Sequence, residues 1–81
     1  MEKELEKRYY GYFIIDSGLK VHFDVSREDN GEYFDKFEFL YNHNKFPWEK
    51  GEVIWLGKEN DYFILADRII GFYINGYKSA K

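Results

Sequence analysis

The chain has 81 residues, with 12 Lys and Arg against 15 Asp and Glu, and its formal charge is -3. This length predicts a single small globular domain over residues 1–81. Because the chain contains no cysteine, a disulfide framework and a thiolate metal site are both excluded. The acidic balance disfavours nucleic acid as a partner, since a nucleic-acid groove needs basic charge.

Aromatic residues are the most unusual part of the composition. Eight Tyr, eight Phe and two Trp make up 22% of the chain. Each ring can bury about 150–250 Å², which is the apolar surface that so short a chain needs for a stable core. The rings also exceed what a small core conceals. We therefore expect several of them to be exposed or to contact a partner.

The N-terminal segment, residues 1–8, mixes both signs of charge and has little apolar content. We expect a short helical turn or a frayed tail there. Because the segment lacks the apolar centre of a secretory signal, the expected location is the cytoplasm. No apolar run approaches the roughly 20 residues that cross a bilayer, so a membrane is not an expected partner.

Two strands joined by a tight turn are predicted next. Residues 9–15 are aromatic and β-branched, and they end in a turn cluster around Ser17 and Gly18. In residues 20–25, apolar and polar side chains alternate, which indicates a strand with one face in water. The two strands should form a hairpin. A polar loop is predicted for residues 26–31.

The segment from Glu32 to Asn42 fits two structures. Rings at Phe37, Phe39 and Tyr41 alternate as in a strand, while a second set of residues fits one face of a helix. The aromatic content leads us to favour the strand. The stretch that follows, residues 43–51, is predicted to be an irregular loop.

The remaining sequence predicts three more strands. Residues 53–56 and 62–66 flank a four-residue polar connection, as in a second hairpin. Residues 69–74 form a last apolar run that stops at Asn75 and Gly76. Within that run, Gly71 indicates a β-bulge or a close approach of two backbones.

These patterns predict a mainly β protein, or an α+β protein with one short helix, built as a small antiparallel curved sheet or barrel of about five to six strands. If the sheet does not close into a barrel, we expect the first and last strands to be its edges, where two copies could form a homodimer. The core is expected to contain Val21, Phe23, Val25, Trp55, Ile64 and Phe72.

No arrangement of residues indicates catalysis. His22 and His43 are the only histidines and are most simply solvated, and a zinc or copper site would need further ligands. No Gly-rich phosphate loop or nucleophile elbow is present. We therefore expect no enzyme activity, no metal and no cofactor.

An acidic segment runs from Asp24 to Glu38, with six acidic residues against two basic ones. A solvated loop and strand edge is the simpler interpretation, and we favour it. The alternative is an acidic patch that binds a protein with a basic surface. The candidate partner-binding acids are Glu28, Asp29, Glu32, Asp35 and Glu38.

The loop sequence Phe46-Pro47-Trp48 is the second candidate for partner binding. Two large rings on either side of a proline can close one end of the fold as a plug, or they can be a binding hot spot. We favour the plug and keep Phe46 and Trp48 as candidate partner-binding residues.

The function that these observations favour is a non-enzymatic protein-binding module. Such a protein could be an inhibitor or modulator encoded by a phage or other mobile element, which engages a host protein through an acidic, aromatic-rich surface. The alternative is a small β-barrel that binds single-stranded nucleic acid by stacking exposed rings on bases. The net charge of -3 weighs against this alternative.

Overall fold

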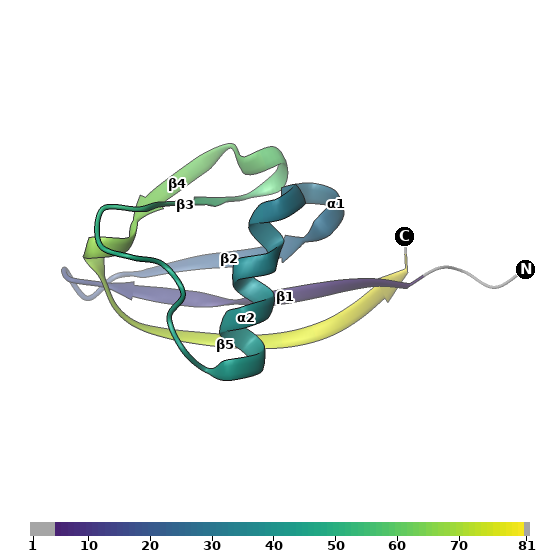
Figure 1. The fold of residues 1–81 in the computed structure, drawn as a ribbon, viewed down its shortest axis with the longest axis horizontal. Helices are drawn as coiled ribbons and strands as arrows, with labels where there is room; N and C mark the ends of the chain where they lie inside the picture. The colour runs from purple at the N-terminus through teal and green to yellow at the C-terminus, as the bar shows by residue number, and fades with distance from the viewer. Residues whose placement is uncertain (1–4, 81) are drawn as a thin grey trace, which may run out of the picture.

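The computed structural model describes residues 5–80, which form a small α+β structure with two antiparallel sheets (Figure 1). The larger sheet has three strands in the order β2-β1-β5, and the smaller is the hairpin β3-β4. The strands are β1 (Leu5–Ile15), β2 (Lys20–Ser26), β3 (Val53–Leu56), β4 (Tyr62–Leu65) and β5 (Ile69–Ala80). The helices are α1 (Arg27–Asn30) and α2 (Phe34–His43), with short 3-10 turns at Gly31–Tyr33, Lys58–Asn60 and Ala66–Arg68.

Helix α2 crosses one face of the three-stranded sheet, and the β3-β4 hairpin lies beside α1 and β2 (Figure 1). The main core lies between this layer and the sheet. It contains Phe13 and Phe23 from the sheet, Phe37 from α2, and Ile54 and Leu56 from β3. Both predicted hairpins are confirmed, and the predicted mainly β or α+β class is confirmed as well. The two sheets do not join into one barrel, and the predicted edge position of the first strand is wrong, because β1 lies in the centre of its sheet between β2 and β5.

The prediction of a strand over residues 32–42 is wrong, because this segment belongs to α2 and the turn before it. Phe34, Phe37 and Leu40 are buried on one helical face, while Phe39 and Tyr41 are exposed. The predicted loop at residues 26–31 is also wrong over α1, which Ser26 caps by accepting a hydrogen bond from the Asp29 amide at 3.1 Å. Aromatic content misled the prediction, because the burial of one helical face outweighs strand propensity.

Two further predictions fail together at the ends of β1 and β5. Residues 5–8 were expected in a helical turn or tail but belong to β1, and residues 75–80 continue β5 beyond its predicted end. The two stretches pair with each other, from Leu5 opposite Ala80 to Arg8 opposite Tyr77. Each has a weak strand pattern alone, so the pairing itself stabilises both. Residues 1–4 of the predicted tail lie outside the described residues.

The predicted core is only partly confirmed. Phe23 and Val25 are buried, and Val21, Ile64 and Phe72 are partly buried against the core. Trp55 is not in the core. It lies on the outer face of the hairpin against Phe63, because Ile54 and Leu56 take the inner positions. Since β3 is apolar on both faces, the period-2 pattern could not assign its inner face.

Two glycines shape the central strand pairs. The register between β1 and β5 shifts between Ile14 and Ile15, which leaves Ile70 of β5 without a partner just before Gly71. This irregularity agrees with the first of the two alternatives predicted at Gly71, a β-bulge. At Gly11, a Cβ atom would overlap the carbonyl oxygen of Tyr73 on the neighbouring strand. Gly11 therefore allows β1 and β5 to approach each other closely.

Candidate functional site

The outer face of the three-stranded sheet, which points away from α2, carries a row of exposed aromatic side chains. Alternation along β1 sends Tyr9 and Phe13 into the core and sends Tyr10 and Tyr12 to this outer face. In the register, Tyr12 lies opposite His22 on β2 and opposite Tyr73 on β5. We define the tyrosine face as Tyr10, Tyr12, His22, Asp24, Tyr73 and Tyr77, which line one shallow groove of about 730 Å³.

The rings of the tyrosine face are ordered by their cross-strand neighbours. Tyr12 and Tyr73 lie nearly parallel with ring centroids 5.6 Å apart, and Tyr10 meets Tyr77 edge to face at 5.5 Å. The Lys20 ammonium lies 4.6 Å above the Tyr12 ring. This contact shows that the ring face accepts a cation, as the negative face of an aromatic ring does in general.

Acidic side chains surround Arg8 at the α1 end of the tyrosine face. Arg8 Nε contacts Asp24 Oδ1 at 2.8 Å, and its Nη2 contacts Asp29 Oδ2 at 3.1 Å. Arg8 Nη1 lies 3.3 Å from Glu6 Oε2. We call these four residues the Arg8 cluster. Three carboxylates against one guanidinium leave the cluster with a net negative charge.

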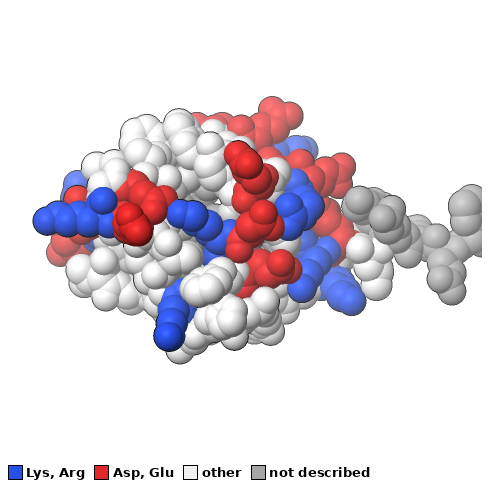
Figure 2. Space-filling view, viewed as in Figure 1, with Lys and Arg blue, Asp and Glu red and all other residues white. Residues whose placement is uncertain are grey.

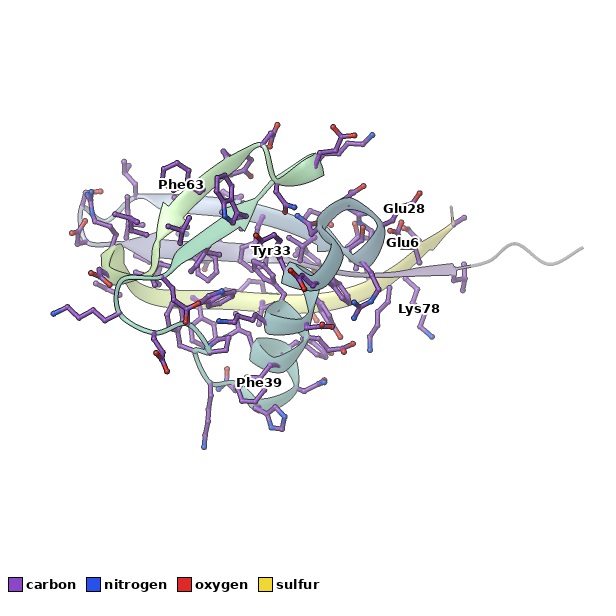
Figure 3. The ribbon with its side chains drawn as sticks, turned by 45° about the horizontal axis from the view of Figure 1, so that its top comes forward. Glu6, Glu28, Tyr33, Phe39, Phe63 and Lys78 are labelled. Atoms are coloured by element: carbon purple, nitrogen blue, oxygen red, sulfur yellow. The ribbon has the colours of Figure 1, made fainter. Side chains whose placement is uncertain are left out.

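The Arg8 cluster is joined to the tyrosine face by a hydrogen bond. The Tyr77 hydroxyl donates to Asp24 Oδ2 at 2.7 Å, and this bond raises the pKa of Tyr77. Within residues 5–80, Glu6 Oε1 is buried and accepts no hydrogen bond. Glu6 lies near Glu28 of α1 (Figure 3), and both line a second groove at the end of β1. The buried Glu6 oxygen is thus an unsatisfied acceptor inside the cluster, whereas the exposed carboxylate of Glu28 beside it can accept a hydrogen bond from outside.

The structure disperses the acidic residues that sequence analysis singled out. Asp35 pairs with Arg27, and Glu38 pairs with Lys7 at 3.1 Å. Asp29 belongs to the Arg8 cluster. Glu28 and Glu32 are exposed and make no ion pair within residues 5–80. On the face that carries α2, acidic and basic side chains accordingly lie side by side over the helices (Figure 2).

The loop rings Phe46 and Trp48 point into the fold. Trp48 is 7% exposed and contacts Phe13 and Phe37 edge to face, with centroids 5.7 and 5.1 Å apart. Phe46 is partly buried against Trp48 and Phe72. Of the two interpretations of this loop, its geometry agrees with the plug. The acids and these rings do not form one exposed surface.

The two histidines have separate aromatic neighbours. His22 lies beside Tyr12 with ring centroids 5.5 Å apart, and the His43 ring is tilted against Phe39 with centroids 4.4 Å apart. Over residues 5–80, no three His, Cys, Asp or Glu side chains gather closely enough to hold a metal ion. Across the same part of the chain, no helix has the length and apolar character needed to cross a membrane.

Sequence analysis missed the tyrosine face. Its signal was present, because Tyr10 and Tyr12 share one parity on β1 and Tyr73 and Tyr77 share one on β5. However, all four residues become one surface only through the β1-β5 register, which the sequence pattern did not predict.

Comparison of the chain with family models, curated proteins and solved structures found no match.

Proposed function

We propose that this protein is a non-enzymatic protein-binding domain and that the tyrosine face is its binding surface. The observation that carries the proposal is the uncovered face of the three-stranded sheet, where four tyrosines and a histidine line one groove. Tyrosine is favoured at binding surfaces because it offers a large rigid ring and a hydroxyl at little cost in conformational entropy.

The chemistry of the surface favours a partner that presents arginine or lysine. The ring faces can stack on a guanidinium, as the Lys20 contact with Tyr12 illustrates. The Arg8 cluster adds carboxylates at one end of the groove, and the Asp24 side chain is 48% exposed. The chain as a whole is acidic, so long-range charge would also steer a basic partner toward it.

The proposal moves the binding surface away from the residues that the sequence suggested. Trp48 is a core residue in this account, and the acidic residues act mainly through Asp24 and Asp29 of the Arg8 cluster. Exposed acids outside the cluster, such as Glu28 and Glu32, act as rim charges that speed association. In biological terms, we propose an inhibitor or modulator encoded by a phage or other mobile element, as the small size and surplus of rings first suggested.

Single-stranded nucleic acid is the competing partner. Tyr12 and Tyr73 lie side by side on a sheet, and rings in this arrangement can stack on successive bases. The carboxylates of the Arg8 cluster count against it, because they would repel the phosphates that pass along the same groove.

A binding assay with three defined probes separates these partners. The probes are a peptide in which arginine alternates with serine, the same peptide with glutamate in place of arginine, and an oligothymidylate. We expect the arginine peptide to bind and the other two to fail. Binding of the oligothymidylate without binding of the arginine peptide would replace the proposal with the nucleic-acid alternative. Binding of neither would reject both.

A matched pair of variants locates the binding. Tyr73 and Tyr33 are similarly exposed, at 46% and 42%, but only Tyr73 lies on the tyrosine face. Tyr73→Ser should weaken binding of the arginine peptide by about 2 kcal/mol, or roughly 30-fold, if the ring is a hot spot. Tyr33→Ser should leave the affinity unchanged. Unchanged affinity in both variants would show that charge alone holds the peptide, and equal losses in both would place the binding outside the tyrosine face.

A further inference from the structure

The two edges of the three-stranded sheet differ in how they are covered. The β2 edge faces the hairpin: β3 lies against β2, and the Tyr62 hydroxyl of β4 donates to the backbone carbonyl of His22 at 3.3 Å. Strand β2 also carries Lys20, His22 and Asp24, and polar or charged side chains of this kind discourage pairing with another strand. The β2 edge is therefore protected.

The β5 edge has none of these protections. Its 12 residues pair with β1 on one side only. Within residues 5–80, no backbone hydrogen bond joins β5 to any segment other than β1, although the Asn75 side chain accepts one bond from the Gly76 amide. The strand contains no proline, and Lys78 is its only residue charged at neutral pH. A long, nearly uncharged edge of this kind is a template for another strand.

The core is also incompletely closed along this edge. Ile69, Phe72 and Ile74 of β5 are only partly buried, as is Phe46, which packs against Phe72. On the surface, Ile70 is 69% exposed. A further strand beside β5 would cover these apolar groups and satisfy the free backbone groups in a single step.

We propose that β5 is a docking edge for a second copy of this chain, which pairs with it antiparallel about a two-fold axis. Two copies of β5 can pair with each other without bringing like charges together. Lys78 lies near one end of β5, so antiparallel pairing places the two lysines at opposite ends of the interface. The partly buried side chains of both copies then lie on the same side of the joined sheet.

The paired strands form one continuous six-stranded sheet. Because the two-fold axis stands perpendicular to that sheet, the tyrosine faces of both copies point in the same direction and meet at Tyr73 and Tyr77. The dimer thus presents a surface twice as wide as that of one chain. The dimer does not depend on which partner the tyrosine face binds, so either proposal can fail alone.

Sedimentation of the unmodified chain from micromolar to submillimolar concentration tests the dimer directly. We expect a concentration-dependent dimer, and a monomer throughout this range would overturn the inference. Two equally exposed aliphatic residues then locate the interface: Ile70 on β5, and Leu19 in the β1-β2 turn at 67%. Ile70→Lys should raise the dissociation constant about tenfold, because two copies each add a charge to the shared edge. Leu19→Lys should leave it unchanged.

Equal effects of Ile70→Lys and Leu19→Lys would place the interface elsewhere and overturn the assignment to β5. A second measurement on the unmodified chain guards against any loss of structure in the variants. Amide hydrogen exchange along β5 should slow as the concentration rises, while exchange in the β3-β4 hairpin should not. Slowing in the hairpin alone would also contradict a β5 interface.

Discussion

The two faces of the three-stranded sheet are made from neighbouring residues, yet one face is covered by other elements and the other is open to water. Phe13 lies across from Val21 and Phe72, and this row is covered by α2 and the Trp48 loop. One residue earlier, Tyr12 lies across from His22 and Tyr73, and this row is open to water. In these two rows the rings without a polar group, Phe13 and Phe72, are packed against the core, whereas Tyr12 and Tyr73 lie on the open face, where a tyrosine can keep its hydroxyl in water. The comparison shows that, in this part of the sheet, phenylalanine rings occupy the covered face and tyrosine rings occupy the open face.

The largest expected effect comes from removing a ring on the covered face. Phe23 is buried between Phe13 and Phe37, with ring centroids 4.9 and 5.0 Å away. Phe23→Ala should lower the free energy of unfolding by about 3–5 kcal/mol, which is most of the stability of a domain this small. Denaturant unfolding followed by tryptophan fluorescence measures the change.

The comparison depends on the open face behaving differently in the same unfolding experiment. Tyr73→Ser removes a ring of similar size from the outer side and should cost less than about 1 kcal/mol, since surface substitutions have small effects. If Tyr73→Ser proves as costly as Phe23→Ala, the tyrosines stabilise the sheet and are not held in reserve for binding.

Both rows of side chains depend on the close approach of β1 and β5. Adding one methyl group at Gly11 tests whether that close approach is required. Gly11→Ala would place its Cβ on the Tyr73 carbonyl oxygen and should cost about 1–3 kcal/mol or more through forced separation of the strands. Gly71→Ala is the matched control on β5. Its Cβ would lie 3.5 Å from an Ile14 methyl group, which is an ordinary contact, so we expect little change in stability.

Helix α1 precedes the helix that covers the inner face, and it is capped by Ser26, whose side chain accepts a hydrogen bond from the Asp29 amide. Ser26→Ala should lower the free energy of unfolding by about 1 kcal/mol, as expected for loss of a helix cap. Circular dichroism during thermal unfolding would detect the shift. A loss of arginine-peptide binding in the folded variant would contradict a purely structural role for Ser26.

The smallest effect concerns the hydroxyl that joins the open face to the Arg8 cluster. The hydrogen bond to Asp24 raises the pKa of Tyr77, because ionisation of the hydroxyl removes the donated proton. This bond therefore stabilises the folded state at neutral pH, and its contribution is lost as the pH rises through the raised pKa. Tyr77→Phe should remove one late step from the alkaline absorbance titration of the tyrosines. Loss of an ordinary tyrosine step, with the late step still present, would show that the bond does not form.

Sequence patterns were sufficient for local structure and insufficient for pairings between distant segments. The alternation of Val21, Phe23 and Val25 predicted β2, and turn residues predicted both hairpins. Helix α1 had a usable signal in the spacing of Ser26 and Asp29, which is typical of a helix start, but this segment was interpreted as a loop and the aromatic residues of α2 that follow were interpreted as a strand.

The candidate site could not be predicted for a related reason. Residues 5–8 and 77–80 become strands only by pairing with each other, and the tyrosine face exists only once β5 lies beside β1. The sequence predicted a binding role for acids and rings, and that role stays a prediction. It could not show that Trp48 is enclosed, or that Asp24 lies beside Tyr77, since both follow from long-range packing.

The most direct test of the tyrosine face is to map amide chemical shifts of the isotope-labelled chain during titration with the arginine-serine peptide. We expect the shifts to concentrate on outward-facing residues of the sheet, at Tyr10, Tyr12, His22 and Tyr73, and to follow one saturable curve. The glutamate peptide should produce none of them. Shifts confined to the exposed acids of α1 and α2, or to the outer face of the β3-β4 hairpin, would contradict the account.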